Sequence, residues 1–263
     1  MSLLNPSLFF PSNLFPPVSS GKSTLLLLLQ GFLVPSSVDG QGDIRIDNIP
    51  LPDIPRSTLR RRIIALPQTP FFLPDGHTIR DNLKVQFDDD DGDTNDDEVM
   101  EYALKAVGLW DDLVAVSQQQ DNSSTASGLA GPLREEALSR GQRQMFGLAR
   151  AVMRATARAR LPDRKENESR GRNGILLLDE YNAGLDADTD KAMWAVISRE
   201  FRGYTIVCVA HRLRYVAECY DKVVVMADGR VVEAGSPGEL LARKNGKLRE
   251  MWELEPTGSE MAR

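Results

Sequence analysis

Residues 175–180 read Ile-Leu-Leu-Leu-Asp-Glu, four apolar residues followed by two acids. A short, continuous apolar run of this kind predicts a strand that is buried on both faces of a sheet. Two more apolar strands are predicted at 205–209 and 222–226, and a helix is predicted at 191–201. Buried strands that alternate with helices predict an α/β fold whose sheet is mostly parallel.

The residues before this strand fit the same fold class. Hydrophobic periodicity predicts, in chain order, a helix after Lys22, a β hairpin within 42–51, a short helix at 57–62, a strand at 63–66, helical structure from 79 to 113 and an amphipathic helix at 143–154. The basic and polar residues 156–173 are predicted to form an inserted surface loop.

Asp179 and Glu180 follow the first strand at its carboxyl end, the edge where α/β sheets bind ligands. Asp179 is predicted to hold a magnesium ion through water. Glu180 is predicted to act as a general base that polarises an attacking water, a role worth about 10² to 10⁴ in rate. The alternative is that the two acids cap the next helix.

A second chemical motif precedes the leucine-rich helix, and its residues are Ser19, Ser20, Gly21, Lys22, Ser23 and Thr24. Backbone amides at a helix start attract anions, and the ammonium of Lys22 adds a positive charge. The segment predicts a phosphate cradle, with the Ser23 hydroxyl as a magnesium ligand. However, Pro16 stands where G-x-x-x-x-G-K-[ST] has its first glycine. An ordinary helix start capped by serine is the alternative.

Residues 138–144, LSRGQRQ, resemble the signature of ATP-binding cassette (ABC) proteins. In that family the signature serine and glycine contact the γ-phosphate held by the phosphate loop of the opposite cassette. The resemblance assigns this contact to the signature segment: Leu138, Ser139, Arg140, Gly141 and Gln142. A plain helix N-cap by Ser139 is the alternative.

Three further segments resemble elements of the same family. Gln68, in ALPQTP, is similar to the Q-loop glutamine, which reaches magnesium and the water and senses the transmembrane partner. His211, in VCVAHRL, is similar to the switch histidine that hydrogen-bonds the γ-phosphate, with core packing as the alternative. The D-loop segment, which in the family packs across the cassette dimer, is Ala183, Gly184, Leu185 and Asp186.

The resemblance implies a nucleotide-binding domain at 19–245 with a P-loop NTPase (RecA-like) sheet. A helical subdomain is inserted in this domain at about 79–156, and a C-terminal tail follows at 246–263. The resemblance also implies ATP and Mg²⁺ as ligands, with Ser23, Gln68 and Asp179 around the ion. The implied partners are a second cassette in a head-to-tail dimer and transmembrane domains that this chain does not contain. The implied location is the cytosolic face of a plasma or vacuolar-type membrane.

Residues 137–154 and the VGLWDDL stretch most resemble the second cassette of the C subfamily, the multidrug-resistance-associated exporters. The start of the chain departs from that pattern. Residues 1–17 contain four prolines, which suit a central strand poorly. We therefore expect residues 1–18 to be a disordered, non-family segment, and the N-terminal β layer and the strand before the phosphate loop to be missing. Pyrimidine-rich codons would encode most of these residues, which raises the hypothesis of a gene-model artefact.

Composition and charge argue against several other classes of function. The net charge is −6, from 32 basic and 38 acidic residues, so a basic surface for nucleic acid is not expected. The two cysteines lie in a predicted strand and helix, which favours a reducing compartment over a disulfide framework. The acidic run at 88–98 predicts a solvated loop, because its spacing does not match a calcium loop.

The sequence therefore predicts an ATPase cassette of an ABC-type exporter. The first alternative is a degenerate cassette that hydrolyses nothing, for which Pro16 and Ser19 in the phosphate loop argue. The second is a soluble cassette ATPase of repair or translation, which a coiled-coil arm or tandem cassettes would indicate. Neither feature is visible in the sequence.

Overall fold

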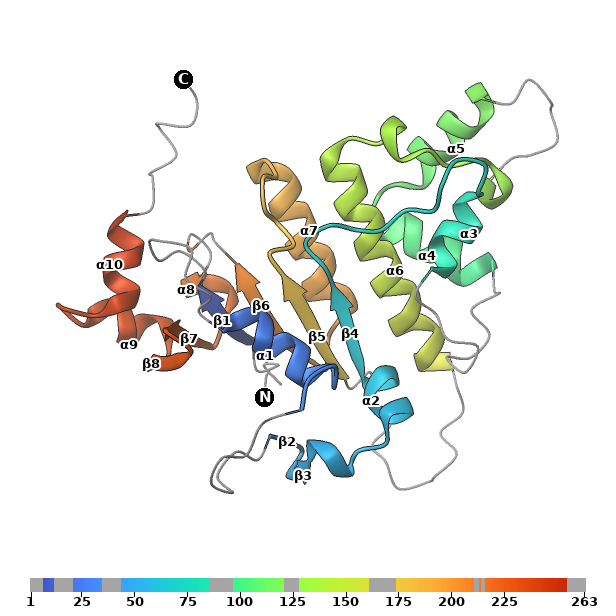
Figure 1. Ribbon diagram of the computed structural model, residues 1–263. Coiled ribbons are helices and arrows are strands. Elements are labelled where there is room, and N and C mark those ends of the chain that lie inside the picture. Colours follow the sequence, from blue (N-terminus) through green and yellow to red (C-terminus); the bar gives the residue numbers. More distant parts are fainter. Residues whose placement is uncertain are drawn as a thin grey trace. The chain divides into compact units, whose positions relative to one another are not determined.

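The computed structural model describes residues 7–11, 21–34, 44–85, 97–120, 128–160, 174–210, 213 and 216–254 (Figure 1). The chain divides into two compact units. The first comprises Met1–Ile63, Gly174–Glu180 and Tyr204–Arg263, and the second comprises Ile64–Asn173 and Tyr181–Gly203.

A sheet with the strand order β5-β6-β1-β7-β8 forms the centre of the first unit. Its strands are β1 (Ser7–Pro11), β5 (Gly174–Asp179), β6 (Tyr204–Ala210), β7 (Lys222–Ala227) and β8 (Arg230–Gly235). β6 runs parallel to both β5 and β1, and β1 runs parallel to β7. Only the β7–β8 pair is antiparallel among these neighbours. The α/β fold with a mostly parallel sheet is thus confirmed.

The expectation that the strand before the phosphate loop is missing was wrong. β1 lies between β6 and β7, with Phe9 paired to Cys208 on one side and Val223 on the other. Proline disrupts a central strand only where it interrupts the ladder, and no proline lies within residues 7–10. Pro11 is the last residue of β1. The expectation of disorder across 1–18 therefore fails for these five residues.

The interior of this sheet is apolar on both faces. Three consecutive residues of β5, Leu176 to Leu178, are buried, and so are four consecutive residues of β6, from Ile206 to Val209. Because successive side chains of a strand point to opposite faces, such runs show that both faces are covered. Neither cysteine forms a disulfide; Cys208 is buried in β6, and Cys219 lies in the short helix α8 (Val216–Cys219).

The other elements of the first unit are short. They are α1 (Lys22–Leu29), the hairpin of β2 (Arg45–Ile46) and β3 (Ile49–Pro50), η1 (Leu51–Asp53), α2 (Arg56–Arg62), α9 (Pro237–Ala242) and α10 (Lys247–Leu254). The segment predicted to be a C-terminal tail, 246–263, contains α10, in which Leu248 and Met251 are buried. The Leu248 amide also donates to the Glu233 carboxylate of β8 at 3.0 Å.

Helices dominate the second unit, and α6 (Arg140–Arg160) is the longest of those described. It contacts α3 (Ile79–Lys84), α4 (Asp97–Ala106) and α7 (Ala187–Glu200). The unit also holds α5 (Trp110–Gln120), η2 (Gly128–Ala130), η3 (Glu135–Ala137) and all but the first residue of β4 (Ile63–Leu66). The predicted start of the surface loop, at residue 156, is too early, because α6 continues to Arg160. Alanine and arginine favour helix, and Ala157 is buried.

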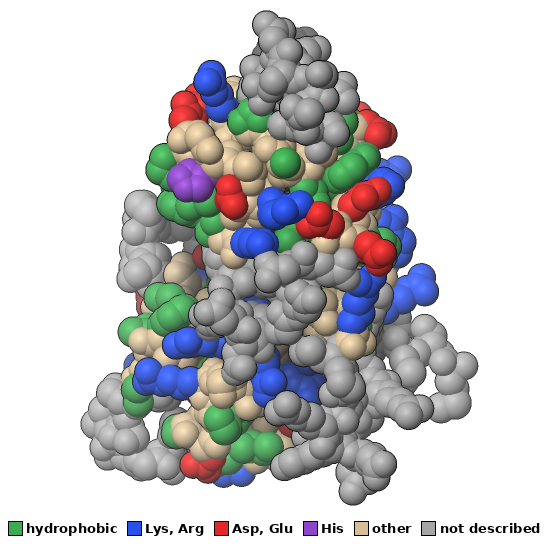
Figure 2. Space-filling view, turned by 90° about the vertical axis from the view of Figure 1, so that its right-hand side faces the viewer, with side chains coloured by type: hydrophobic (Ala, Val, Ile, Leu, Met, Phe, Trp, Pro, Cys, Tyr) green, Lys and Arg blue, Asp and Glu red, His purple; other side chains and the backbone are tan. Residues whose placement is uncertain are grey.

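The described surface carries charges of both signs. Basic and acidic side chains lie beside one another on the face that Figure 2 presents, with apolar side chains between them. Within the described part of the chain, no helix has the length and apolar character needed to cross a membrane.

A proline at position 9 tests whether β1 belongs to the sheet. Phe9→Pro removes an amide from a strand flanked on both sides, so we expect the free energy of unfolding in urea to fall by about 3 kcal/mol. Pro11→Ala, at the strand end, is the matched control and should change it by less than about 0.5 kcal/mol. Equal stabilities of the two variants would show that residues 7–11 are not part of the sheet.

Candidate functional site

The predicted phosphate cradle begins at a glycine whose backbone needs a special conformation. Gly21 has φ 83° and ψ 2°, in the left-handed region, and is the N-cap of α1. Its carbonyl accepts the amide of Leu25 at 2.9 Å, which starts the helix. A Cβ at Gly21 would meet ordinary contacts at 3.5 Å and 3.6 Å, so the φ angle, and not space, favours glycine here.

The first turn of α1 suits an anion. No side chain of the described residues caps its N-terminus, and the turn contains no acidic residue. Ser23 and Thr24 are exposed there. The first amides of a helix have no partner within the helix, and the positive end of the helix dipole lies beside them. Negatively charged oxygens are the ligands that such a helix start attracts.

Lys22 and Glu180 meet at this helix start. Partial burial of Lys22 lowers the pKa of its ammonium below the ordinary value of lysine, and the negative charge of Glu180 opposes that shift. The carboxylate therefore lies near enough to stabilise the ammonium. A cation and an acid thus lie within electrostatic range of each other near the carboxyl edge of the sheet.

Glu180 itself has a strained backbone. Its φ is 46°, the left-handed region, which costs a residue with a side chain about 1–2 kcal/mol. The amide of Glu180 donates to the Val209 carbonyl of β6 at 2.7 Å. This bond fixes the turn directly after β5 and holds Glu180 at the strand exit. Backbone strain that the surrounding structure maintains is a frequent feature of functional sites.

The signature segment forms a capped helix start in the second unit. Ser139 and Gln142 form a reciprocal capping pair: the Ser139 amide donates to Gln142 Oε1 at 2.9 Å, and the Gln142 amide donates to Ser139 Oγ at 3.2 Å. Gln142 Nε2 also donates to Asp112 of α5 at 3.0 Å. Leu138 is buried, whereas Ser139 and Arg140 are exposed. Ser139 therefore caps the start of α6, on a helix end that stays accessible, and its contact with the phosphate of a partner stays a prediction.

The D-loop segment lies against the signature segment within the second unit. Gly184 has φ 70°, and a Cβ there would collide with the guanidinium of Arg140. Asp186 is the N-cap of α7, and hydrogen bonds from the Thr189 side chain and backbone lower the pKa of its carboxyl. Ahead of it, Asn182 donates to the buried Asp190 carboxylate at 3.1 Å. These contacts give the segment a defined path.

Gln68 follows Pro67 at the exit of β4, and its side chain is exposed. Its backbone carbonyl accepts a hydrogen bond from Nε2 of Gln144, a buried side chain of α6. Sequence analysis did not single out Gln144, because a glutamine near a helix start is usually exposed. The only sequence signal for a role of Gln144 was its position two residues after the signature segment.

Comparison with known proteins identifies the family of the chain. The family profile described as ABC transporter matches residues 17–158, more than half of the chain. The chain belongs to the ABC transporter family. Domains of this family bind ATP.

Two curated ABC transporters and one solved ABC exporter resemble the chain over most of its length. It is 42% identical over 236 residues to the ABC-type transporter braE of Annulohypoxylon truncatum, covering 89% of the chain and 14% of that protein. It is 38% identical to the ABC transporter FGM5 of Gibberella zeae, covering 90% and 14%. A bacterial Atm1-family ABC exporter solved with ATP bound matches with a TM-score of 0.68 and 25% identity, over 97% of this chain and 37% of that one. The chain thus spans about one seventh of these curated ABC transporters.

The ABC motifs fall into two groups by compact unit. The first unit contains Gly21, Lys22, Ser23, Thr24, Asp179 and Glu180. The second contains Gln68, Leu138, Ser139, Arg140, Gly141, Gln142, Ala183, Gly184, Leu185 and Asp186. Ser19, Ser20 and His211 lie outside the described residues.

The donor atoms of the first unit fit Mg²⁺ bound together with phosphates. The described residues contain no group of three or more His, Cys, Asp or Glu that could hold a metal. Mg²⁺ typically takes one or two protein carboxylates together with phosphate oxygens and waters. Asp179, at the end of β5, could supply such a carboxylate, and the uncapped start of α1 suits phosphate oxygens.

Two substitutions at Glu180 separate backbone strain from chemistry. Glu180→Gly and Glu180→Ala both remove the carboxylate, but only alanine keeps a side chain at φ 46°. We expect the glycine variant to be more stable by about 1 kcal/mol, measured by urea unfolding. If the alanine variant is equally stable, the left-handed turn after β5 is not strained.

Proposed function

We propose that the chain is the ATP-binding and ATP-hydrolysing cassette of an ABC-type membrane exporter, coupling ATP hydrolysis to transport. The observation that supports this most is the meeting of the Lys22 ammonium and the Glu180 carboxylate beside the uncapped start of α1. A phosphate ligand and an acid suited to activate water then share one site. Membership of the ABC transporter family supports the same assignment.

Each residue proposed to bind ATP or Mg²⁺ has a defined task. The first amides of α1 and the Lys22 ammonium bind phosphate oxygens, together with Ser19, Ser20, Gly21 and Thr24 of the same loop. Mg²⁺, when bound, neutralises charge that develops on the phosphates. Ser23, Gln68 and, through water, Asp179 are the residues that would hold it. Glu180 orients the attacking water and accepts its proton at a carboxylate oxygen, and His211 hydrogen-bonds the γ-phosphate.

The second unit supplies the contact to a second cassette. The exposed Ser139 and Arg140 begin α6, and helix starts attract phosphate, which supports a head-to-tail dimer in which the signature segment meets ATP held by the partner. The D-loop segment would pack across the same dimer. Transmembrane domains would complete the transporter on the cytosolic face of a plasma or vacuolar-type membrane.

The proposed transporter type is the second cassette of a C-subfamily, multidrug-resistance-associated exporter. Residues 137–154 and the VGLWDDL stretch support it. The long curated relatives, of which this chain spans 14%, support a larger protein around such a cassette. The alternative is a degenerate cassette without ATPase activity, which Pro16 and Ser19 in the phosphate loop favour.

Magnesium-dependent binding and turnover of ATP by the purified chain test the proposal. We expect Lys22→Ala to lose ATP binding, because it removes the phosphate ligand, measured by calorimetry. Glu180→Gln should keep binding but lose turnover by about 10² or more, measured as phosphate release. The exposed Lys244→Ala and Glu218→Gln are the matched controls and should behave as the unchanged chain.

Three outcomes separate the possibilities. The ATPase cassette is supported if the unchanged chain turns over ATP, Lys22→Ala loses ATP binding, and Glu180→Gln binds ATP but loses turnover. Binding without turnover in the unchanged chain supports the degenerate cassette. Absence of ATP binding by a folded chain contradicts the ATPase cassette and also favours the degenerate cassette.

A further inference from the structure

One face of α6 holds the segment that follows Gln68. Three α6 residues spaced three apart, Gln144, Gly147 and Arg150, each contact the stretch 66–72. Residues at this spacing lie on one side of a helix. The stretch is therefore fixed along two turns of the helix that begins with the signature segment.

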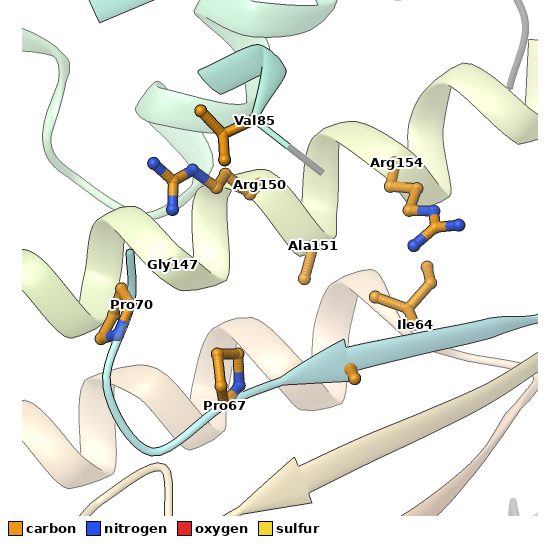
Figure 3. A pocket seen from close by; sticks show the side chains of 9 residues that line it. Ile64, Pro67, Pro70, Val85, Gly147, Arg150, Ala151 and Arg154 are labelled. Carbon is orange, nitrogen blue, oxygen red and sulfur yellow. The ribbon is translucent and has the colours of Figure 1, made fainter. Parts of the chain in front are cut away.

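The middle contact depends on the absence of a side chain. A Cβ at Gly147 would lie 3.0 Å from Pro70 Cγ and 3.3 Å from Leu66 Cδ1. Figure 3 shows Pro70, on the segment that leaves β4, close to the α6 backbone at Gly147. Glycine here lets the segment approach the helix closely enough for the contacts on either side.

The contact farthest from the start of α6 is made by a buried arginine, which donates hydrogen bonds to backbone carbonyls. Arg150 is 5% exposed, and it donates to the Phe71 carbonyl at 2.6 Å and to the Asn82 carbonyl at 2.8 Å. Its guanidinium lies 5.3 Å and 5.0 Å from the ring centroids of Phe72 and Phe146. Burial lowers the pKa of Arg150 to about 10, so the side chain stays charged at neutral pH. Arg150 thus holds the segment three residues beyond Gln68.

The contact nearest the start of α6 is a hydrogen bond from Gln144 to Gln68 itself. Gln144 is 4% exposed, and its Nε2 donates to the Gln68 carbonyl. Its Oε1 is buried and has no hydrogen-bond partner among the described residues. A buried acceptor without a partner opposes folding, so a methionine would be less costly at this position. Folding stability alone therefore does not account for a glutamine here.

We propose that Gln144 is a positioning residue for Gln68, which it fixes to the helix that carries the signature segment. The inference rests on the proposed function, in which Gln68 serves the magnesium site and the signature segment serves the partner's ATP. The hydrogen bond makes Gln68 and the start of α6 move as one body. Displacement of Gln68 at its own site would then be transmitted to the signature segment.

Hydrogen exchange of the full chain, followed by mass spectrometry without nucleotide, tests the positioning directly. Gln144→Met keeps the side-chain volume but removes the donor, so amides of residues 68–73 should exchange about fivefold faster or more, because one hydrogen bond is lost. Amides of the first unit should keep their protection. Arg143→Ala, which removes an exposed neighbour paired to Glu135, is the matched control and should leave residues 68–73 unchanged.

Gln144→Glu keeps the size of the side chain but can donate a hydrogen bond only when its carboxyl is protonated, so pH should switch the contact on and off. Its ionised carboxylate cannot donate to the Gln68 carbonyl, so this variant should exchange like Gln144→Met at neutral pH. At a pH where the carboxyl is protonated it can donate again, and protection relative to the unchanged chain should return. Gln144→Met, whose side chain does not titrate, should show no such pH dependence.

The results decide between positioning and a structural role. Unchanged exchange at 68–73 in both Gln144 variants would overturn the proposal, and so would an equal loss of protection over the whole chain. If the chain turns over ATP, Gln144→Met should lower kcat about tenfold while KM for ATP stays within about twofold, because Lys22 is untouched. Absence of ATP binding would contradict the proposed function but leave the exchange result, and hence the contact, established.

Discussion

Parallel pairing of β6 with both β5 and β1 is the constraint on which the candidate site depends. In register, the last residue of β5, Asp179, pairs with Val209, and the last residue of β1, Pro11, pairs with Ala210. The chain therefore leaves both strands at the same edge, about 10 Å apart across β6. One exit leads to Glu180 and the other to Gly21 and Lys22. The charge interaction between Lys22 and Glu180 follows from this register, because residues so distant in sequence meet only through the sheet.

The second unit is organised around one helix. The same α6 begins with the signature segment, contacts the D-loop segment through Arg140, and holds the residues after Gln68 through Gln144, Gly147 and Arg150. The contacts through Gln144, Gly147 and Arg150 each use a feature that costs stability, either a buried polar group or a glycine within a helix. Their concentration on the helix that joins three ABC motifs indicates that this helix serves more than packing.

The parts of the fold that depend on local patterns followed from the sequence. The run at 175–178 and the acids after it predicted β5 and its exit, because a short apolar run that ends in acids is typical of a buried strand reaching the edge of its sheet. β1 was missed because four prolines were counted over residues 1–17 as one block, although only Pro11 lies within the strand. Gln144 and Arg150 were missed for a different reason. Whether a polar side chain is buried is decided by tertiary packing, which helix periodicity does not report.

The most direct test of the account is a titration of the Lys22 ammonium by NMR of nitrogen-labelled lysine side chains, assigned with Lys22→Arg. We expect the pKa of Lys22 to lie below the ordinary lysine value of 10.5. In Glu180→Gln it should fall further, because the negative charge that favours the ammonium is gone. This result would place the two groups in one site without any ligand. An identical pKa in both proteins would contradict the arrangement of β1 and β5 and, with it, the site.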